Sequence, residues 1–582
     1  MGSRRLLPLA SVFVATLFPR LSLGQDSRSL VEEQARQLSE QYLRAYRVRY
    51  PEAADGSAAE LFDNSRGAYT RWARTETNFL SRLVRIADHV NVASPEAVTL
   101  ALLKERLEAS HAFEACHREL WNVSPVTGWL PEYRGYAAQQ PAGTPAQRSA
   151  ALQRWRQLPT FINTEIDNLR FGQPRGFSAP RVLVTATIAQ LDRVLAAPTH
   201  ESPFFAPALR DTSTVFRNAF ELLVREQITP AIKRYRNFLA HDYLRDARET
   251  VGVVYNPGGG ACFRALVRRY TSLPLTSVEL DSMGRDLLRR GIAERTKTQL
   301  RRGQLSSPQT LHLQLVADSA NRFRSAREVM TYTYDALHRA WVVAPQWFGR
   351  LPTEPLPSID SLPGADASDP TAQYVPASPG NQRSKILLNL SELLKPGAKL
   401  YLERVVFHEG VPGHHLQIAL QQSSTVSALN RALFSPAFVE GWAVYASNLA
   451  DDMGLYTSVA SRFPLVEALV DDGLTFLVQS GLHAHGWSRA QAVDTMLVYS
   501  SDSRAEVEQQ VDYYIAAPGH ALAYPVGARA IDRLRRDAML QLGSRFDVRR
   551  FHDAVLANGP VSLTTLRGTV AQWIAQERTQ SR

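Results

Sequence analysis

Three histidines and one glutamate lie close together between residues 408 and 415, where the chain reads HEGVPGHH. The segment follows a stretch from Lys399 whose apolar residues recur at helical spacing. A His-Glu pair on a helix is half of a common zinc site, in which imidazoles bind the ion and the glutamate activates water. We therefore predict that His408 is a metal ligand and that Glu409 is a general base.

The second imidazole cannot follow at the usual helical spacing, because Pro412 stands four residues after His408. Proline has no N–H to donate to the preceding turn, so a regular helix should end here. Gly410 and Gly413 allow the backbone to turn sharply. A later histidine can then return toward His408.

Either His414 or His415 could be the second ligand, but neighbours on a helix point about 100° apart and cannot both face one ion. We favour His414, because Gly413 before it permits a close backbone approach, and a helix restarting at Pro412 would place His414 in its first turn. His415 should then lie behind the ligands and orient one of them.

A third ligand is expected from a helix predicted to begin at Pro436, with Ser435 as its N-cap. Glu440 is the only acidic or basic residue from Pro436 to Ala446. A buried carboxylate is costly without a partner, so Glu440 should bind the metal; an ion pair with an arginine is the alternative. Two histidines and one carboxylate leave an open zinc position, as in catalytic sites.

The strings HEGVPGHHLQ and FVEGWAVYAS resemble the bacterial family known as domain of unknown function 885. Three other segments are similar to family segments: GGGACFRALVRRYTSLPLTSVELDSMG, SGLHAHGWSRAQAV and YYIAAPGHALAYPVG. The resemblance covers most of the chain and is densest from about 250 to 530. It implies a large, mainly helical domain like those of the zincin metallopeptidases whose third ligand is a glutamate, with the core of the metal site at about 395–530.

By this resemblance, His408, one histidine of the HH pair and Glu440 would bind one zinc ion per chain, with Glu409 as general base. His483 and Tyr524 would lie near the metal, where neutral donors could stabilise a tetrahedral oxyanion. The alternatives for these two residues are a histidine that caps a helix end and a tyrosine of the core.

Besides Phe263, which stands where a tyrosine is commoner, the chain departs from the family pattern at three positions near the predicted site. Gln479 stands where an acid is common, Tyr513 where an arginine is common, and His520 where a glutamine is common. The metal ligands are unaffected, but a missing arginine would remove an anchor for a peptide carboxylate.

These observations predict a zinc-dependent hydrolase, first of all a metallopeptidase with a peptide or amide substrate. Zinc would polarise the scissile carbonyl, and Glu409 would pass a proton from water to the leaving amine. Two alternatives stay open. One is a metal- or peptide-binding protein without turnover on the same fold, and the other is an amide hydrolase acting on non-peptide substrates.

The N-terminus has the pattern of a secretory signal peptide. Arg4 and Arg5 precede a short apolar run from Leu6 to Phe18, and the small residues Ser22 and Gly24 suit cleavage after Gly24. We therefore expect an exported protein, periplasmic or secreted. The chain would then divide into a signal peptide, residues 1–24, and one domain, residues 25–582.

Apolar periodicity predicts a mainly α fold with a few short strands. The clearest predicted helices are Ser29–Tyr50, Ala146–Leu169 with a break at Pro159, Pro180–Ala197 and Val215–Tyr243. Only Leu311–Leu315 and Lys385–Leu390 alternate as strands would. Residues 351–383 are rich in Pro and Ser and predict a loop that covers the site.

The composition excludes several classes of protein. With 582 residues, 45% hydrophobic and 21% charged, the chain is neither disordered nor fibrous, and no apolar run is long enough to span a membrane. Two cysteines exclude a Cys-rich zinc module, although Cys116 and Cys262 could pair. The net charge of +10 comes from scattered arginines without a nucleic-acid motif, so no nucleic-acid partner is expected. Pairs such as Arg268-Arg269, Arg289-Arg290 and Arg301-Arg302 are typical of solvated helix faces.

Overall fold

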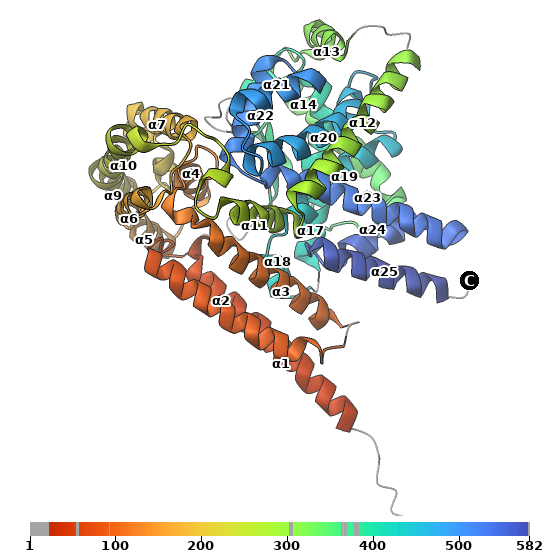
Figure 1. The fold of residues 1–582 in the computed structure, drawn as a ribbon, viewed down its shortest axis with the longest axis horizontal. Coiled ribbons are helices and arrows are strands. Elements are labelled where there is room, and N and C mark those ends of the chain that lie inside the picture. The colour runs from red at the N-terminus through yellow and green to blue at the C-terminus, as the bar shows by residue number, and fades with distance from the viewer. Residues whose placement is uncertain are drawn as a thin grey trace, which may run out of the picture.

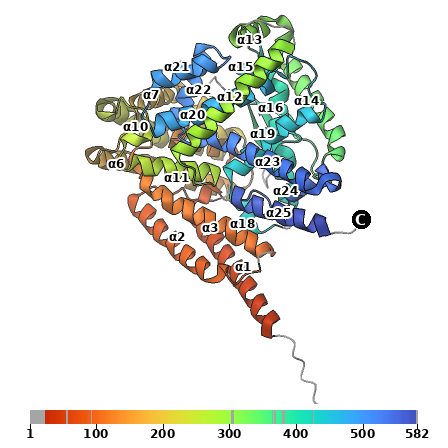
Figure 2. The same cartoon turned by 45° about the vertical axis from the view of Figure 1, so that its right-hand side comes forward.

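The structure, a computed structural model, describes residues 23–579 apart from 54–57, 92–93, 302–306, 363–364, 366–368, 378–382 and 425. These residues form helices almost throughout, with one small sheet, so the prediction of a mainly helical fold is confirmed (Figures 1 and 2). The predicted signal peptide lies outside the described residues, except for Leu23 and Gly24. Among the described residues, no helix is both long and apolar enough to cross a membrane.

The first three long helices form a layer along one side of the molecule, as both views show (Figures 1 and 2). They are α1 (Leu23–Arg49), α2 (Arg66–Ala87) and α3 (Pro95–Phe113). Their shared core includes Tyr42, Trp72 and Leu103. The predicted helix at 29–50 is confirmed in α1. The rest of the chain packs on one face of this layer.

A second group of helices surrounds an aromatic core that includes Trp155, Phe220 and Tyr235. Its members are α4 (Trp129–Gln139), α5 (Pro145–Trp155), α6 (Leu158–Gly172), α7 (Arg181–Ala196), α8 (Ala206–Leu209), α9 (Thr214–Leu223) and α10 (Thr229–Asn237). The three helices predicted here are confirmed. The break near Pro159 falls between α5 and α6, and π-helical turns at 224–228 and 238–243 follow α9 and α10.

The remaining helices form the rest of the fold, and most of them contribute to a large apolar core that includes Phe407, Trp442 and Phe476. They are α11 (Gly259–Thr271), α12 (Ser277–Arg301), α13 (Pro308–Ala317), α14 (Ala326–Val343), α15 (Leu390–Leu393), α16 (Ala398–Glu409), α17 (His414–Ser423), α18 (Ala428–Ala432), α19 (Pro436–Asp452), α20 (Phe463–His483), α21 (Arg489–Tyr499), α22 (Arg504–Ala516), α23 (Ala523–Leu542), α24 (Val548–Leu556) and α25 (Leu563–Thr579).

Helices α19 and α23 approach closely because each has a glycine at their contact. A Cβ atom on Gly441 would collide with the backbone of Gly527, and one on Gly527 would collide with the carbonyl of Ala437. Only glycine permits this backbone contact. The contact fixes α23 beside the helix that carries Glu440.

The sheet has three strands in the order β1-β3-β2: β1 (Ser358–Ser361), β2 (Ala372–Val375) and β3 (Lys385–Leu388). Strand β1 is parallel to β3, and β2 is antiparallel to it, with Tyr374 opposite Ile386. The predicted strand at 385–390 is confirmed by β3. The predicted loop 351–383 is wrong in part, because β1 and β2 lie within it and gain partners only from the distant β3.

The strand predicted at 311–315 is wrong, because this segment lies inside α13. The Ser307 hydroxyl accepts a hydrogen bond from the Thr310 N–H, and Pro308 occupies the first turn, which together start a helix. Five alternating residues are too few to outweigh these signals.

Cys116 and Cys262 form a disulfide with an S–S distance of 2.09 Å, which joins the segment after α3 to α11. The arginine pairs differ from one another. Arg289 and Arg290 are exposed on α12 as predicted, whereas Arg268 and Arg269 are half-buried, so that prediction is wrong for them. The Arg301 side chain and Arg302 lie outside the described residues.

Candidate metal centre

The chain turns sharply between α16 and α17, as the sequence predicts. Helix α16 ends at Glu409, a cis peptide bond precedes Pro412, and α17 begins at His414. A Cβ atom on Gly413 would collide with the carbonyl oxygen of His408, so glycine is required here. The Trp442 indole of α19 donates a hydrogen bond to the Pro412 carbonyl at 3.0 Å, which attaches the turn to α19.

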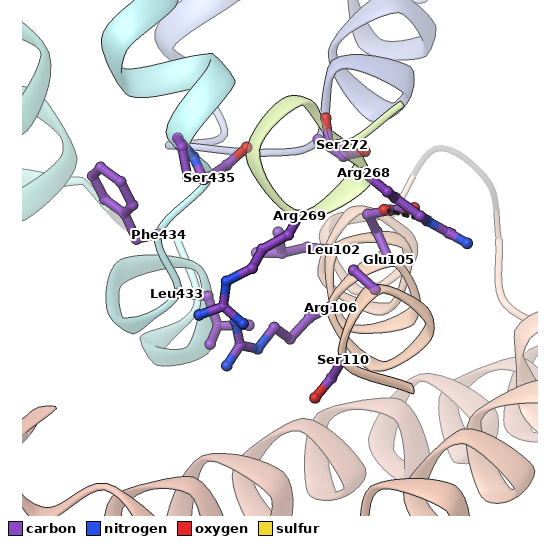
Figure 3. Close-up of a pocket in the computed structure, with 13 residues that line it drawn as sticks. Leu102, Glu105, Arg106, Ser110, Arg268, Arg269, Ser272, Leu433, Phe434 and Ser435 are labelled. Atoms are coloured by element: carbon purple, nitrogen blue, oxygen red, sulfur yellow. Dashed lines mark hydrogen bonds and ion pairs between the residues drawn. The ribbon is translucent and has the colours of Figure 1, made fainter. Parts of the chain in front are cut away.

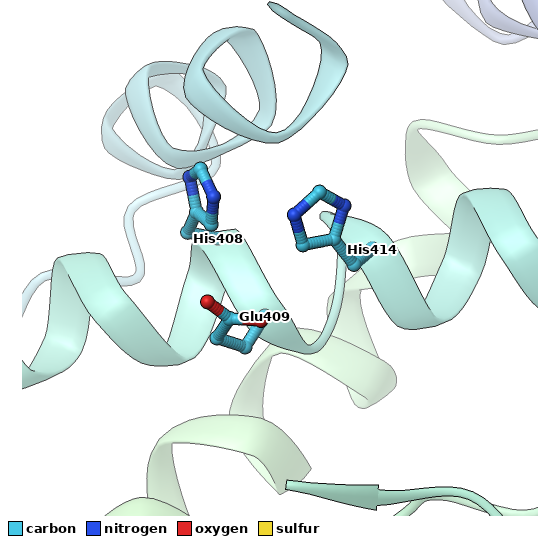
Figure 4. A group of neighbouring side chains, drawn as sticks. All are labelled: His408, Glu409 and His414. Carbon is cyan, nitrogen blue, oxygen red and sulfur yellow. The ribbon is translucent and has the colours of Figure 1, made fainter. Parts of the chain in front are cut away.

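The turn brings two imidazoles to one carboxylate. The Nε2 atoms of His408 and His414 each lie 3.5 Å from the same oxygen, Oε2 of Glu440. The two rings are 4.8 Å apart between centroids and almost perpendicular. Figure 4 shows His408 on α16 and His414 at the start of the next helix, with their rings facing each other. Three residues from three helices therefore meet at one point.

These three groups fit the donor set of a zinc ion. Atoms bonded at about 2.0–2.1 Å to a tetrahedral zinc lie roughly 3.3 Å apart, close to the 3.5 Å of both His-Glu contacts. The Nδ1 atom of His414 is buried without a hydrogen-bond partner among the described residues. The donor chemistry, two imidazoles and one carboxylate, is that of an open catalytic zinc site.

The electrostatics of the cluster favour a charged Glu440. Burial alone would raise the pKa of its carboxyl, but the imidazoles of His408 and His414 hold that pKa well below its usual range. Burial would lower the pKa of His414, but Glu440 and Glu409 raise it. In the described part of the chain, the ion pairs of Glu440 are with these two histidines, so the alternative of an arginine partner is not realised.

Glu409 lies beside the imidazoles without replacing Glu440. Its carboxylate and the nitrogens of His408 and His414 all lie within 4.8 Å of one another. Its Oε2 atom accepts a hydrogen bond of 2.8 Å from the Tyr374 N–H of strand β2. Glu440 lies nearer to both histidines than Glu409 does, so Glu440 is the carboxylate that could hold a metal ion together with them.

His415 points away from the cluster. It is fully buried, and its Nδ1 atom lies 3.2 Å from the Tyr374 hydroxyl and 3.4 Å from the Ser384 hydroxyl. Burial lowers its pKa to about 4, so the ring is neutral at pH 7. His415 thus lies between α17 and the sheet, and its hydrogen-bond partners are Tyr374 and Ser384, so the expectation that it orients a metal ligand directly is not realised.

Tyr524 is brought to the cluster. Its ring stacks on that of His408 with centroids 6.3 Å apart, and α23 is held there by the glycine contact with α19. Burial, together with the negative charge of Glu440, raises the pKa of Tyr524 well above its usual value. The phenol therefore keeps its proton and is available as a donor.

His483 is not brought to the cluster, which corrects the expectation that it lies near the metal. Its Nδ1 atom accepts the Val253 N–H at 3.4 Å, and its Nε2 lies 3.0 Å from the Tyr514 carbonyl. Both bonds together require a neutral ring with its proton on Nε2. Burial lowers the pKa of His483 to about 3, so this histidine joins backbone segments at the end of α20.

The three departures from the family pattern lie near one another. Gln479 accepts a hydrogen bond of 2.8 Å from the Gly519 N–H, and the Tyr513 hydroxyl lies 2.6 Å from Nδ1 of His520. The His520 ring is also 5.8 Å from that of Tyr524. Tyr513 and His520 therefore contact each other next to Tyr524, and Gln479 binds the residue that precedes His520.

Sequence reasoning missed Tyr374, which contacts Glu409 through its N–H and His415 through its hydroxyl. One signal could have found it, because Tyr374 is the only aromatic residue from 351 to 383. The prediction that this stretch covers the site is consistent with these contacts.

Comparisons with known proteins agree with this architecture. The family model described as "Bacterial protein of unknown function (DUF885)" matches residues 45–570. The crystal structure of "the putative lipoprotein from Colwellia psychrerythraea" has a TM-score of 0.85 at 19% identity and covers 94% of this chain and 99% of its own. A "putative lipoprotein of unknown function from Shewanella oneidensis" has a TM-score of 0.69 at 15% identity and covers 92% and 99%. These two likenesses show the fold alone, and no curated protein matches. With 45–570 matched, the chain belongs to the bacterial DUF885 family.

Proposed function

We propose that the protein is an exported zinc-dependent metallopeptidase of the zincin type. The observation that carries this proposal is the 3.5 Å approach of two imidazole nitrogens to one carboxylate oxygen, with a second carboxylate beside them. A metal-binding protein without turnover would need only the first three groups. The fourth, Glu409, supports hydrolysis.

The donor set assigns a task to each member of the cluster. His408, His414 and Glu440 would hold one zinc ion, which supplies Lewis acidity to the scissile carbonyl. Two neutral imidazoles and one carboxylate leave one net positive charge on such a site, which favours the developing oxyanion. Tyr524, protonated beside His408, can donate a hydrogen bond to that oxyanion.

Glu409 would move the proton. Its carboxylate takes a proton from the attacking water and then passes it to the leaving nitrogen. The Tyr374 N–H donates to one of its oxygens and so fixes its orientation, while the other oxygen can accept the proton. A base held by backbone in this way needs no rearrangement during the reaction.

The neighbouring strand favours a peptide substrate. Strand β2 is at the edge of the sheet, and its Tyr374 N–H already points at Glu409. An extended peptide can pair with an edge strand through backbone hydrogen bonds. This edge strand is our reason for proposing a peptide before other amides as the substrate.

Zinc analysis and the variant Glu409→Gln test the proposal together. The purified protein should hold about one zinc per chain, and the variant should keep it while turnover of a broad peptide library falls by roughly 10²–10⁴-fold. Glu294→Gln, at an exposed position on α12, is the matched control and should change neither quantity. Zinc without cleavage of any peptide would instead favour a binding protein, and cleavage of acylated amines alone would favour an amide hydrolase.

Export has its own test. Two structural relatives are described as putative lipoproteins, and the predicted cleavage site lies after Gly24. Mass spectrometry of the protein recovered from the periplasm or medium should show a chain that begins at or near Gln25. An intact Met1 would contradict export by this signal.

A further inference from the structure

A cavity of about 970 Å³ lies between the N-terminal helices and the loop that leads into α19. Its volume is at the upper end of the range of ligand sites and is large enough for a short peptide. The wall is rich in aromatic rings, among them Tyr46, Phe113, Trp129 and Phe434. No residue of the metal cluster lines this cavity, but two residues of its wall, Pro436 and His520, lie close to the cluster.

Two residues of the cavity wall connect the cavity to the metal cluster. Pro436 lines the cavity and lies one helical turn before Glu440, on the same face of α19. His520 also lines it, and its ring is 5.8 Å from that of Tyr524, which stacks on His408. A ligand bound in the cavity can therefore extend to the cluster.

Two arginines from different helices share this part of the cavity. Arg106 comes from α3 and Arg269 from α11, and both line the cavity together with Leu433 and Phe434. Figure 3 shows their guanidinium groups pointing into the same space beside Leu433. Two positive charges that converge in this way repel each other unless an anion lies between them.

Among the described residues, no carboxylate lies within ion-pair distance of either arginine, although Glu76 lies near enough for its charge to act on Arg106. Glu76 accepts hydrogen bonds from Tyr42 at 2.9 Å and from Ser110 at 2.5 Å. Among the described residues, Nε of Arg106 is buried without a hydrogen-bond partner, and Arg269 makes no ion pair, only a contact with the Phe113 ring at 4.7 Å. A ligand with a carboxylate would give both guanidinium groups a hydrogen-bond partner and a counter-charge.

The adjacent arginine shows what a neutralised side chain looks like in the same place. Arg268 donates two hydrogen bonds to Glu105, at 2.8 and 2.9 Å, and one to Glu108 at 2.6 Å. Helices α3 and α11 thus pair one arginine fully with acids and leave the next residue on each helix, Arg106 and Arg269, facing the cavity. Arg268 differs from Arg106 and Arg269 because acids lie within reach of its guanidinium group, although all three arginines belong to the same two helices.

Two acids of the cavity wall, Glu165 and Glu132, are weak counter-charges. Burial raises the pKa of Glu165 to about 7, although the Asn64 amide donates a hydrogen bond to it at 2.8 Å. Burial also raises the pKa of Glu132, against the hydrogen bond from Tyr136. The arginine end of the cavity is therefore the one suited to an anion.

We propose that Arg106 and Arg269 bind the C-terminal carboxylate of a peptide substrate, so that the enzyme removes a short fragment from the C-terminus. Guanidinium groups bind carboxylates through paired hydrogen bonds, and two of them select a free terminus. This inference rests on the proposed peptidase function. Because the cavity wall includes Pro436, one helical turn before Glu440 on α19, a peptide held by the two arginines can extend toward the cluster.

The reaction itself is ordinary hydrolysis. Water oxygen bonds to the scissile carbonyl carbon, the C–N bond breaks, and Glu409 carries the proton from the water to the leaving nitrogen. The leaving amine belongs to the C-terminal fragment, whose carboxylate stays on the arginines until release. No further reactant is needed.

Binding and cleavage are measured separately, so that this inference and the peptidase proposal fail in different ways. The Glu409→Gln protein is titrated by calorimetry with three peptides: Ala-Ala-Ala-Phe with a free carboxylate, the same peptide as its C-terminal amide, and Ala-Ala-Ala-Asp amide. We expect the free acid to bind at least about tenfold more tightly than either amide, which corresponds to about 1.4 kcal/mol. Adding Arg269→Gln or Arg106→Gln should abolish that difference, and Arg269→Lys should restore part of it.

Arg268→Gln is the matched control on the same helix, and the tenfold preference should survive it even if the protein loses stability. Equal binding of acid and amide, no binding of either, equally tight binding of the aspartyl amide, or an unchanged preference in Arg269→Gln would each overturn the anchor. If the preference holds but the zinc-loaded wild type cleaves no peptide, the anchor stands and the peptidase proposal falls. If the wild type cleaves acid and amide with equal kcat/KM, the peptidase stands and the anchor falls.

Discussion

His408 and His414 differ from His483 and His552 in where their ring nitrogens point. The first two turn Nε2 toward one oxygen of Glu440 and keep 19% and 10% of their side chains exposed. His483 and His552 are fully buried, and each uses both nitrogens for hydrogen bonds within the protein, His552 with the Trp347 carbonyl and the Tyr445 hydroxyl, both at 2.8 Å.

This difference distinguishes a histidine that can bind a metal or exchange a proton from one that only stabilises the fold. A ring with both nitrogens satisfied can neither bind a metal nor exchange a proton without losing a buried hydrogen bond. Burial lowers the pKa of His483 and of His552 to about 3, so both stay neutral, whereas the pKa of His414 is raised by carboxylates. Position at the end of a helix is common to His408 and His483 and does not distinguish them.

The largest expected effect is loss of the metal from the open cluster. Glu440→Ala and His414→Ala each remove one of three ligands, so zinc content after dialysis should fall to near zero and turnover with it. Elemental analysis of the dialysed variants measures the loss. Full zinc and activity in Glu440→Ala would make that carboxylate structural and the site wrong.

A smaller effect is expected for His415, which lies behind the ligands against Tyr374 and Ser384. His415→Ala should weaken zinc binding by roughly 10–100-fold without abolishing it, as is typical when an outer partner of a metal site is lost. Competition with a zinc chelator measures this change. If His415→Ala lost zinc more completely than His414→Ala, the two histidines would exchange roles.

The buried histidines should affect stability instead of metal binding. His483→Ala removes two hydrogen bonds and leaves a cavity, so the free energy of unfolding should fall by roughly 2–4 kcal/mol while zinc per folded chain stays constant. Urea denaturation and elemental analysis of the same sample give both numbers. If His483→Ala lost zinc without losing stability, His483 would belong to the metal site and its structural role would be wrong.

The smallest effect is a pH dependence of that stability loss. The pKa of His483 is about 3 in the folded protein, below the ordinary value of 6.5, so the unfolded chain takes up a proton first as the pH falls. Its contribution is therefore complete above about pH 6.5 and is lost as the pH falls toward 3, at up to about 1.4 kcal/mol per pH unit. The difference in unfolding free energy between wild type and His483→Ala should shrink from pH 7 to pH 5, and a constant difference would contradict a neutral buried ring.

The sequence predicted those parts of the site that depend on the backbone restrictions of single residues such as proline and glycine. Proline at 412 cannot continue a helix, and glycine at 413 permits contact with the His408 carbonyl, so the break and the return of the chain were predictable. The start of α19 was predicted from Pro436 as well, although the Ser435 hydroxyl does not form the expected capping bond.

The sequence alone determined the mainly helical fold and the interruption of the helix after His408, because helical periodicity, proline and glycine act over a few residues. The motifs around these residues also determined the family. The tertiary structure decided which groups the histidines meet. His483 is held by Val253, 230 positions away, and Glu409 by Tyr374 of a strand that exists only when β3 is beside it. It also decided that Arg268 meets two acids while Arg269 meets a cavity. Such partners come from distant parts of the chain, and local propensity carries no information about them.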